Sequence, residues 1–271
     1  MQLSEIKTIY QKELKGIYPL EEIDSIFFRC TAHYLNLERF ILLVQPNYTV
    51  TKTEEKPLFE ALTRLKTNEP VQHILGQAYF MDLTLEVNEH TLIPRPETEE
   101  LVQWILDDNR QKETKEVNIL DMGTGSGCIA IACAYAFEHA KVDASDISAD
   151  ALAVAEINRR DHGLEDRVQL LESDLFESIP GKRYDIIVSN PPYVSLQEMA
   201  ELPAEFMFEP GASALAAGET GMDIVLPMLV QARDYLTDDG ILVVEVGYSK
   251  PALEALLPEV PFFWVDFEFG A

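Results

Sequence analysis

The first part of the chain carries apolar residues at helical spacing. They recur every three or four positions, the pattern of a helix with one buried face. Breaks at Pro19, Pro46 and Pro70 separate the stripes. We therefore expect a small all-helical domain over residues 1–70. The stripes are Leu3, Ile6, Tyr10, Leu14 and Ile17, then residues 23–43 and 58–65.

Residues 77–93 change to a period of two, which is typical of strands. Asp82 interrupts the alternation near a possible turn, so the segment predicts a β-hairpin. The hairpin would form a linker over residues 71–95. After Pro94-Arg95-Pro96, acidic residues crowd the first turn of a helix expected over 97–106, as the helix dipole favours.

From residue 117 onward, apolar strand-like runs alternate with helical segments. Continuous apolar strands between helices indicate a parallel sheet that is covered on both faces. We therefore predict an α/β fold with a Rossmann-like sheet over residues 96–271, joined to the helical domain by the hairpin. The expected strands are 117–122, 141–146, 167–173, 184–189, 241–247 and 262–269, and the helices are 127–137, 148–160, 222–236 and 250–257.

Composition and charge narrow the functional classes. The 271 residues carry a formal net charge of −26, which disfavours a nucleic-acid partner because such binding depends on Lys and Arg at phosphates. Three cysteines without a CxxC pair indicate a reducing compartment. Neither a secretory signal nor an apolar run of the ~20 residues that span a membrane is present, so the cytoplasm is expected. Five scattered histidines lack metal-ligand spacing, and we expect no metal.

A glycine-rich loop follows the first strand of the predicted sheet. Its sequence, Asp121-Met122-Gly123-Thr124-Gly125-Ser126-Gly127, leads into a helix, where glycines let the backbone approach a ligand closely. Gly125, Gly127 and Ala130 also match a dinucleotide fingerprint, and Asp146 lies at the expected distance for its ribose. A turn that only packs strand on helix is a third interpretation. The candidates for ligand contact are Asp121, Gly123, Thr124, Gly125 and Gly127.

Two further carboxylates end the next two strands. Asp146 ends the second strand of the sheet, and Asp174 follows the third. Each could simply cap a helix or turn. Because the carboxyl ends of parallel strands lie along one edge, Asp121, Asp146 and Asp174 together favour a nucleoside pocket.

The fourth strand leads directly into Asn190-Pro191-Pro192-Tyr193. The prolines stiffen the turn and remove two backbone donors, so the local carbonyls are left to accept. The Asn190 side-chain oxygen and the Pro191 carbonyl could accept both protons of a planar NH2 group, with Tyr193 against its face. An Asn-Pro turn that only ends a strand is the alternative, but the position after the fourth strand favours a site.

These motifs together resemble class I S-adenosylmethionine-dependent methyltransferases that act on an amino or amide group. The resemblance is sharper outside the sheet and extends over nearly the whole chain, to the PrmC/HemK family of release-factor glutamine methyltransferases. Met122 stands where a Leu is common before the first glycine, a swap of similar volume. The segments that carry this likeness are the helical domain, Glu69–Gly76, Thr91–Glu99, the NPPY motif and Glu209-Pro210-Gly211-Ala212.

The resemblance implies methyl transfer from S-adenosylmethionine to the N5 amide nitrogen of the glutamine in the GGQ motif of peptide chain release factors. It implies that the glycine loop with Asp121 holds the methionine end of the cofactor, that Asp146 binds the ribose, and that Asp174 with Leu175 binds the adenine. Asn190 and Pro191 would grip the substrate amide beside Tyr193. Arg95–Glu99 would lie near the cofactor. The enzyme would be a monomer, and the family's sheet continues into a last antiparallel strand beyond Ala271.

Two other functions fit part of the sequence. An adenine-N6 methyltransferase acting on DNA or RNA would use NPPY equally well, but it needs a cationic path for the backbone. A non-catalytic nucleotide-binding module would explain the glycine loop and Asp146, but it gives no reason for NPPY.

Overall fold

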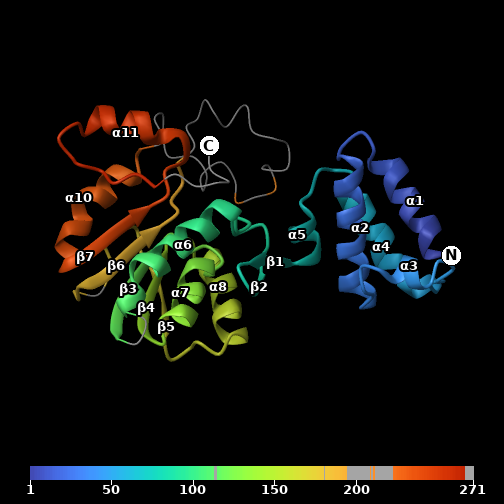
Figure 1. Cartoon of the computed structure of the whole chain (residues 1–271), viewed down its shortest axis with the longest axis horizontal. Coiled ribbons are helices and arrows are strands. Elements are labelled where there is room, and N and C mark those ends of the chain that lie inside the picture. Colours follow the sequence, from blue (N-terminus) through green and yellow to red (C-terminus); the bar gives the residue numbers. More distant parts are fainter. Residues whose placement is uncertain (113–114, 180, 194–207, 209, 211–221, 266–271) are drawn as a thin grey trace. The chain divides into compact units, whose positions relative to one another are not determined.

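Figure 1 shows the computed structural model of the chain, which describes residues 1–112, 115–179, 181–193, 208, 210 and 222–265. Its internal contacts separate two compact units, Met1–Gly76 and Gln77–Ala271. Within the described ranges, no helix combines the length and the apolar character needed to cross a lipid bilayer.

The first unit is helical, as the apolar stripes predict. The buried residues of its stripes, among them Leu3, Tyr10, Phe27, Leu58 and Leu65, form one hydrophobic core. The helices are α1 (Leu3–Leu14), α2 (Leu20–Leu35), α3 (Ile41–Val44), α4 (Lys52–Leu65) and α5 (Val71–Leu75).

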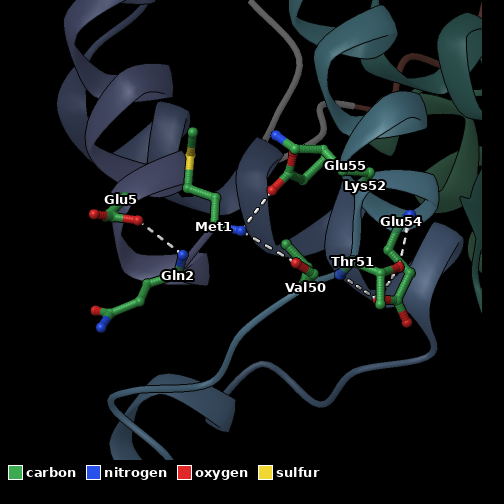
Figure 2. A network of polar contacts seen from close by, with 8 residues as sticks. All are labelled: Met1, Gln2, Glu5, Val50, Thr51, Lys52, Glu54 and Glu55. Atoms are coloured by element: carbon green, nitrogen blue, oxygen red, sulfur yellow. Dashed lines mark hydrogen bonds and ion pairs between the residues drawn. The ribbon is translucent and has the colours of Figure 1, made fainter.

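Polar contacts fix the start of α4 and link it to the start of α1 (Figure 2). The Thr51 side chain accepts from the backbone N–H of Glu54, and the Glu54 carboxylate accepts from the backbone N–H of Thr51 at 2.7 Å. This reciprocal capping satisfies donors that a helix start leaves unpaired. The Met1 ammonium group donates to Glu55 Oε1 at 2.6 Å and to the Val50 carbonyl at 3.2 Å.

The sequence pattern predicts a hairpin linker over residues 71–95, and the structure divides that segment differently. Residues 71–75 form α5, which packs within the helical unit and ends at Gly76 in the left-handed conformation. The hairpin itself consists of β1 (Gln77–Phe80) and β2 (Leu83–Glu86), paired antiparallel around Met81 and Asp82. The run at 71–75 is too short for its apolar period to separate helix from strand.

The second unit contains a five-stranded parallel sheet in the order β5-β4-β3-β6-β7. Among the described strands, the chain runs outward from β3 to β5, returns to β6 on the other side of β3 and continues to β7. Ligands of such sheets bind beyond the carboxyl ends of the strands, where the order reverses, which here lies between β3 and β6. The strands are β3 (Glu116–Met122), β4 (His139–Asp146), β5 (Val168–Glu172), β6 (Tyr184–Ser189) and β7 (Leu236–Val244).

Helices cover both faces of the sheet (Figure 1). Side chains of α6 (Pro96–Asp108) and α7 (Cys128–Ala136) pack with Ile119, Val142 and Ile186 in one core. On the opposite face, α10 (Val225–Tyr235) packs against Leu120 and Ile187. The described part of the unit also contains α8 (Ala149–Asp161), beside β4 and β5, and the short α11 (Lys250–Leu256).

The structure confirms the Rossmann-like sheet, the helical N-terminal region and the hairpin. It does not bear out the strand expected over 262–269, because described residues 262–265 form no strand and the rest of that segment lies outside the described residues. Phe262 and Trp264 pack instead against a small core around Val246 and Leu253. Phe262 and Trp264 alternate with more exposed residues, so the sequence has the period of a strand. The described residues 262–265 nevertheless pair with no strand.

Candidate active site

The glycine loop connects β3 to α7 through three left-handed residues. Gly123, Gly125 and Gly127 have φ values of +73°, +54° and +83°, which favour glycine because it has no Cβ. A Cβ on Gly127 would lie 3.4 Å from both Ala155 and Ile131, so this glycine also permits close packing of α7 on α8. A Cβ on Gly123 or Gly125 would have no described atom within 4 Å, so at these positions the backbone conformation alone requires glycine.

Asp121 lies beneath this loop at the end of β3 and is fully buried. Its Oδ2 accepts from the Thr124 hydroxyl at 2.6 Å and from the Ala130 backbone N–H at 3.0 Å. Its Oδ1 is buried without a hydrogen-bond partner in the described part of the chain. Burial raises the pKa of Asp121 to about 7, because the charged form loses its hydration. A cation above the loop would compensate this carboxylate.

Asp146 joins the loops that follow β3 and β4. Its Oδ2 accepts from the Gly125 backbone N–H at 2.9 Å, and its Oδ1 accepts from the Ser148 backbone N–H at 2.9 Å. Each carboxylate oxygen has a second lone pair, so both can still accept from a ligand hydroxyl. The predicted ribose contact is therefore compatible with the structural role of Asp146.

The third loop, after β5, is tied to the second. The Ser173 backbone N–H donates to the Asp146 carbonyl at 3.0 Å, and the Ser173 hydroxyl donates to the Leu175 carbonyl at 2.8 Å. Leu175 is half-buried with a φ of +46°, a conformation that is costly for a side chain of this size. Asp174 is exposed at the same edge. The three predicted strand ends thus share one connected edge.

The NPPY segment begins beside the glycine loop. Ser189, the last residue of β6, is paired with Met122 at the end of β3, and its hydroxyl donates to the Met122 carbonyl at 2.6 Å. Asn190 therefore follows the strand end adjacent to Gly123. Asn190 is half-buried, and Pro191 is buried. The structure accordingly places the candidate acceptor groups and the glycine loop on neighbouring strands.

A chain of hydrogen bonds links NPPY to α6 and to the end of β7. Asn190 Nδ2 donates to Thr98 Oγ1 at 2.8 Å, and the Thr98 hydroxyl donates to Glu245 Oε2 at 2.9 Å. The Tyr193 hydroxyl donates to the other carboxylate oxygen, Oε1 of Glu245, at 3.2 Å. The Glu245 backbone N–H donates to the Ser189 carbonyl at 3.0 Å, which fixes its position. One carboxylate thus connects both polar side chains of the NPPY motif.

Burial is the largest influence on the pKa values of Glu245 and Tyr193 in this hydrogen-bonded group. It raises the pKa of the Glu245 carboxyl, while the hydrogen bonds from Thr98 and Tyr193 act in the opposite direction. Burial, together with the adjacent Glu245 charge, raises the pKa of Tyr193. Tyr193 therefore remains a neutral hydrogen-bond donor at physiological pH.

The structure explains part of the predicted segment Arg95–Glu99. Thr98 contacts the NPPY end of the site, as described above. Glu99 Oε1 accepts from the Met81 backbone N–H at 2.6 Å and so holds the turn of the hairpin. Of the segment at 209–212, Glu209, Gly211 and Ala212 lie outside the described residues.

Two further residues near the site belong to none of the sequence motifs. Glu245 stands as the one charged residue in the apolar run ILVVEVG, a signal that it needs a buried partner. Asn158 is buried on α8. Its side-chain oxygen accepts from the Glu86 backbone N–H, and its NH2 group donates to the carbonyls of Glu86 and of Ser126 in the glycine loop. No local pattern marks Asn158, because its partners are distant in the sequence.

Two family models match the chain. The methyltransferase small domain matches residues 101–225, which include β3 to β6 and the loops described above. The PrmC N-terminal domain matches residues 13–76 of the helical unit.

Named relatives are similar over most of the chain. A ribosomal protein uL3 glutamine methyltransferase of Francisella tularensis subsp. tularensis is 40% identical over 225 residues, covering 80% of this chain and 70% of the relative. One of Neisseria gonorrhoeae is 37% identical over 244 residues, covering 88% and 79%. Among solved structures, a SAM-dependent methyltransferase from Agrobacterium tumefaciens aligns with a TM-score of 0.47 and 18% identity, covering 67% of this chain and 56% of that one.

Proposed function

Because the chain belongs to a family of S-adenosylmethionine-dependent protein glutamine methyltransferases, we propose that it methylates the side-chain amide nitrogen of a glutamine in a protein of the translation apparatus. The observation that supports this acceptor is the geometry of Asn190. Its amide nitrogen is bound by Thr98 within the protein, which leaves the oxygen to accept from a substrate NH2 group. Asn190 follows the strand beside the glycine loop.

The residues around the glycine loop suit the cofactor. Asp121 Oδ1, which has no hydrogen-bond partner among the described residues, lies beneath the loop, where an ionised Asp121 would favour a cation. Asp146 and the third loop offer acceptors at the next two strand ends. Bound there, S-adenosylmethionine would supply a methyl group already activated by a positively charged sulfur. The chain itself then needs to exclude water and to align the acceptor nitrogen.

Asn190, Pro191 and Tyr193 would align that nitrogen. The lone pair of an amide nitrogen is delocalised, so glutamine is a poor nucleophile, and positive charge grows on nitrogen as the methyl group arrives. The Asn190 oxygen and the Pro191 carbonyl would accept the two amide protons and so stabilise that charge in the transition state. Tyr193 would pack against the flat amide, held by Glu245.

We propose ribosomal protein uL3 as the first acceptor to test, because both relatives compared above are named for it. The charge distribution supports a basic acceptor of this kind. Residues 1–76 contain 9 Lys and Arg against 10 Asp and Glu, whereas residues 77–271 contain 12 against 37. Proteins that bind ribosomal RNA present Lys and Arg to phosphates, and such a surface would be attracted to the acidic catalytic unit.

The GGQ glutamine of peptide chain release factors is the second candidate acceptor. It is favoured by the IPRPETE run and NPPY, the motifs on which the resemblance to release-factor methyltransferases depends. Both acceptors present a glutamine amide to the same site chemistry. They differ in the protein surface around that glutamine, so the helical unit is the place to look for the distinction.

The helical unit would recognise the protein substrate. Phe40, Leu43 and Val44, on and beside α3, expose most of their apolar side chains to solvent. Large exposed apolar residues that gather on one short segment are typical of protein contacts.

The test is a methylation assay with both acceptors. The protein and its Asn190→Ala variant are incubated with methyl-labelled S-adenosylmethionine and with purified uL3 or a release factor, and the label is located by mass spectrometry. Label on a glutamine of uL3, lost in the variant, supports the first acceptor. Label only on the GGQ glutamine supports the second. Label on neither protein, with cofactor binding intact, contradicts the proposal.

A further inference from the structure

We propose that Thr98 and Glu245 are positioning residues that set the orientation of the Asn190 amide, so that its oxygen and not its nitrogen faces the acceptor. This inference rests on the proposed function, in which the acceptor is an amide NH2 group. The two ends of an Asn side chain have nearly the same shape but opposite hydrogen-bonding character. A flipped Asn190 would present donors to a donor, and the substrate amide would lose its acceptor.

Glu245 sets which groups donate and which accept in this series of hydrogen bonds. The Thr98 hydroxyl donates to Glu245 Oε2 at 2.9 Å and the Tyr193 hydroxyl donates to Oε1, so both oxygens of this carboxyl group act as acceptors. Thr98 has a single hydroxyl proton, and only lone pairs remain on the side facing Asn190. The contact of 2.8 Å between Thr98 Oγ1 and Asn190 therefore requires the NH2 end of the amide. Glu245 thus determines the Asn190 orientation without touching it.

The second oxygen of Glu245 extends the same control to Tyr193. It accepts from the Tyr193 hydroxyl at 3.2 Å, and the Glu245 backbone is held by the Ser189 carbonyl at 3.0 Å. The groups that surround the Glu245 charge are Thr98 and Tyr193 in direct contact, with Glu97 and Arg95 acting over longer distances. One carboxylate after β7 therefore orients both side chains predicted to grip the acceptor amide.

Thr98 offers a clean pair of variants. Thr98→Val keeps the shape and removes the hydroxyl, whereas Thr98→Ser keeps the hydroxyl. Thr91→Val is the matched control, because Thr91 is also buried and, among the described residues, its hydroxyl contacts the backbone of Asn88. We expect Thr98→Val to lower kcat by about tenfold to a hundredfold, as for loss of an oriented group in the transition state. S-adenosylhomocysteine affinity should stay within about twofold, and Thr98→Ser should recover most of kcat.

A second readout does not depend on turnover. In 15N-labelled protein, the Asn190 side-chain amide signal is identified by its loss in Asn190→Ala. We expect slow solvent exchange of one amide proton in the wild type and in Thr98→Ser, and fast exchange in Thr98→Val. An unchanged amide signal in Thr98→Val, or equal kcat losses in Thr98→Val and Thr98→Ser, would overturn the inference. Should the wild type methylate neither uL3 nor the release factor, the proposed acceptors fail while the amide signal still decides the orientation.

Discussion

Asp146 Oδ2 accepts a hydrogen bond from the Gly125 backbone N–H at 2.9 Å, so the loop after β4 holds the glycine loop after β3 in place. The second oxygen binds the Ser148 backbone N–H at the start of α8. The residue predicted to bind ribose is therefore also part of the framework of the site.

This double role predicts an unequal effect of two substitutions. Asp146→Ala removes the support of Gly125 and both ribose acceptors, and we expect S-adenosylhomocysteine affinity to fall by about a hundredfold or more. Asp146→Asn keeps one acceptor oxygen and should lose less. Isothermal titration calorimetry measures both. Equal affinity in Asp146→Ala and the wild type would contradict the assignment.

Asp121 predicts a pH dependence of cofactor binding. Its pKa is raised to about 7 by burial, and a bound cation favours the ionised form. Binding should therefore release a proton, and affinity should rise as pH increases toward 7 and level off above it, by up to about tenfold per pH unit below the pKa. Calorimetry at several pH values measures the slope. Asp121→Asn should remove it, and an unchanged slope in that variant would contradict the prediction.

Gly247 predicts a steric effect on Tyr193. A Cβ at Gly247 would lie 2.5 Å from Tyr193 Cε2, so Gly247→Ala must displace the ring. We expect a lower kcat with little change in cofactor affinity. Gly163→Ala is the matched control, because Gly163 also has a positive φ but open space around it. Similar kcat losses in the two variants would show that backbone strain, and not the Tyr193 contact, is responsible.

The exposed segment at α3 predicts an effect on protein recognition alone. Leu43 and Val44 expose 78% and 74% of their surfaces, so replacing both with Ser should leave stability nearly unchanged. We expect KM for the protein acceptor to rise by about tenfold, with unchanged cofactor affinity. Val230→Ser, at a residue that is 76% exposed in the catalytic unit, is the control. An unchanged KM in the double variant would exclude α3 from the substrate contact.

Asn158 predicts a stability effect through the hairpin. Its amide satisfies the N–H and carbonyl of Glu86 and the carbonyl of Ser126. Asn158→Ala leaves these groups unpaired, and we expect the free energy of unfolding to fall by about 2–4 kcal/mol. Asn109→Ala removes the one side-chain hydrogen bond that buried Asn109 makes to described residues, to the Ile105 carbonyl, and should cost less. Urea denaturation measures the difference, and equal losses would contradict this role.

Much of the fold could be predicted from the sequence because its cause is local. Alternating apolar runs and helical periods define β3 to β6 and the helices between them within a few residues. The short helix at 71–75 and the unpaired residues 262–265 could not be assigned in this way. In each, a short apolar pattern fits more than one backbone conformation, and tertiary packing decides between them.

In the site, too, some features follow from the local sequence and others depend on tertiary packing. The sequence alone determined which residue types end the strands, because Gly123, Gly125 and Gly127 are required by backbone conformation and NPPY stiffens its own turn. Only the tertiary structure brought Thr98 to Glu245, 147 residues apart, and bonded Thr98 to Asn190. Hydrogen-bond partners of this kind depend on strand order and helix packing, which place distant side chains together and leave no period or spacing in the sequence to reveal them.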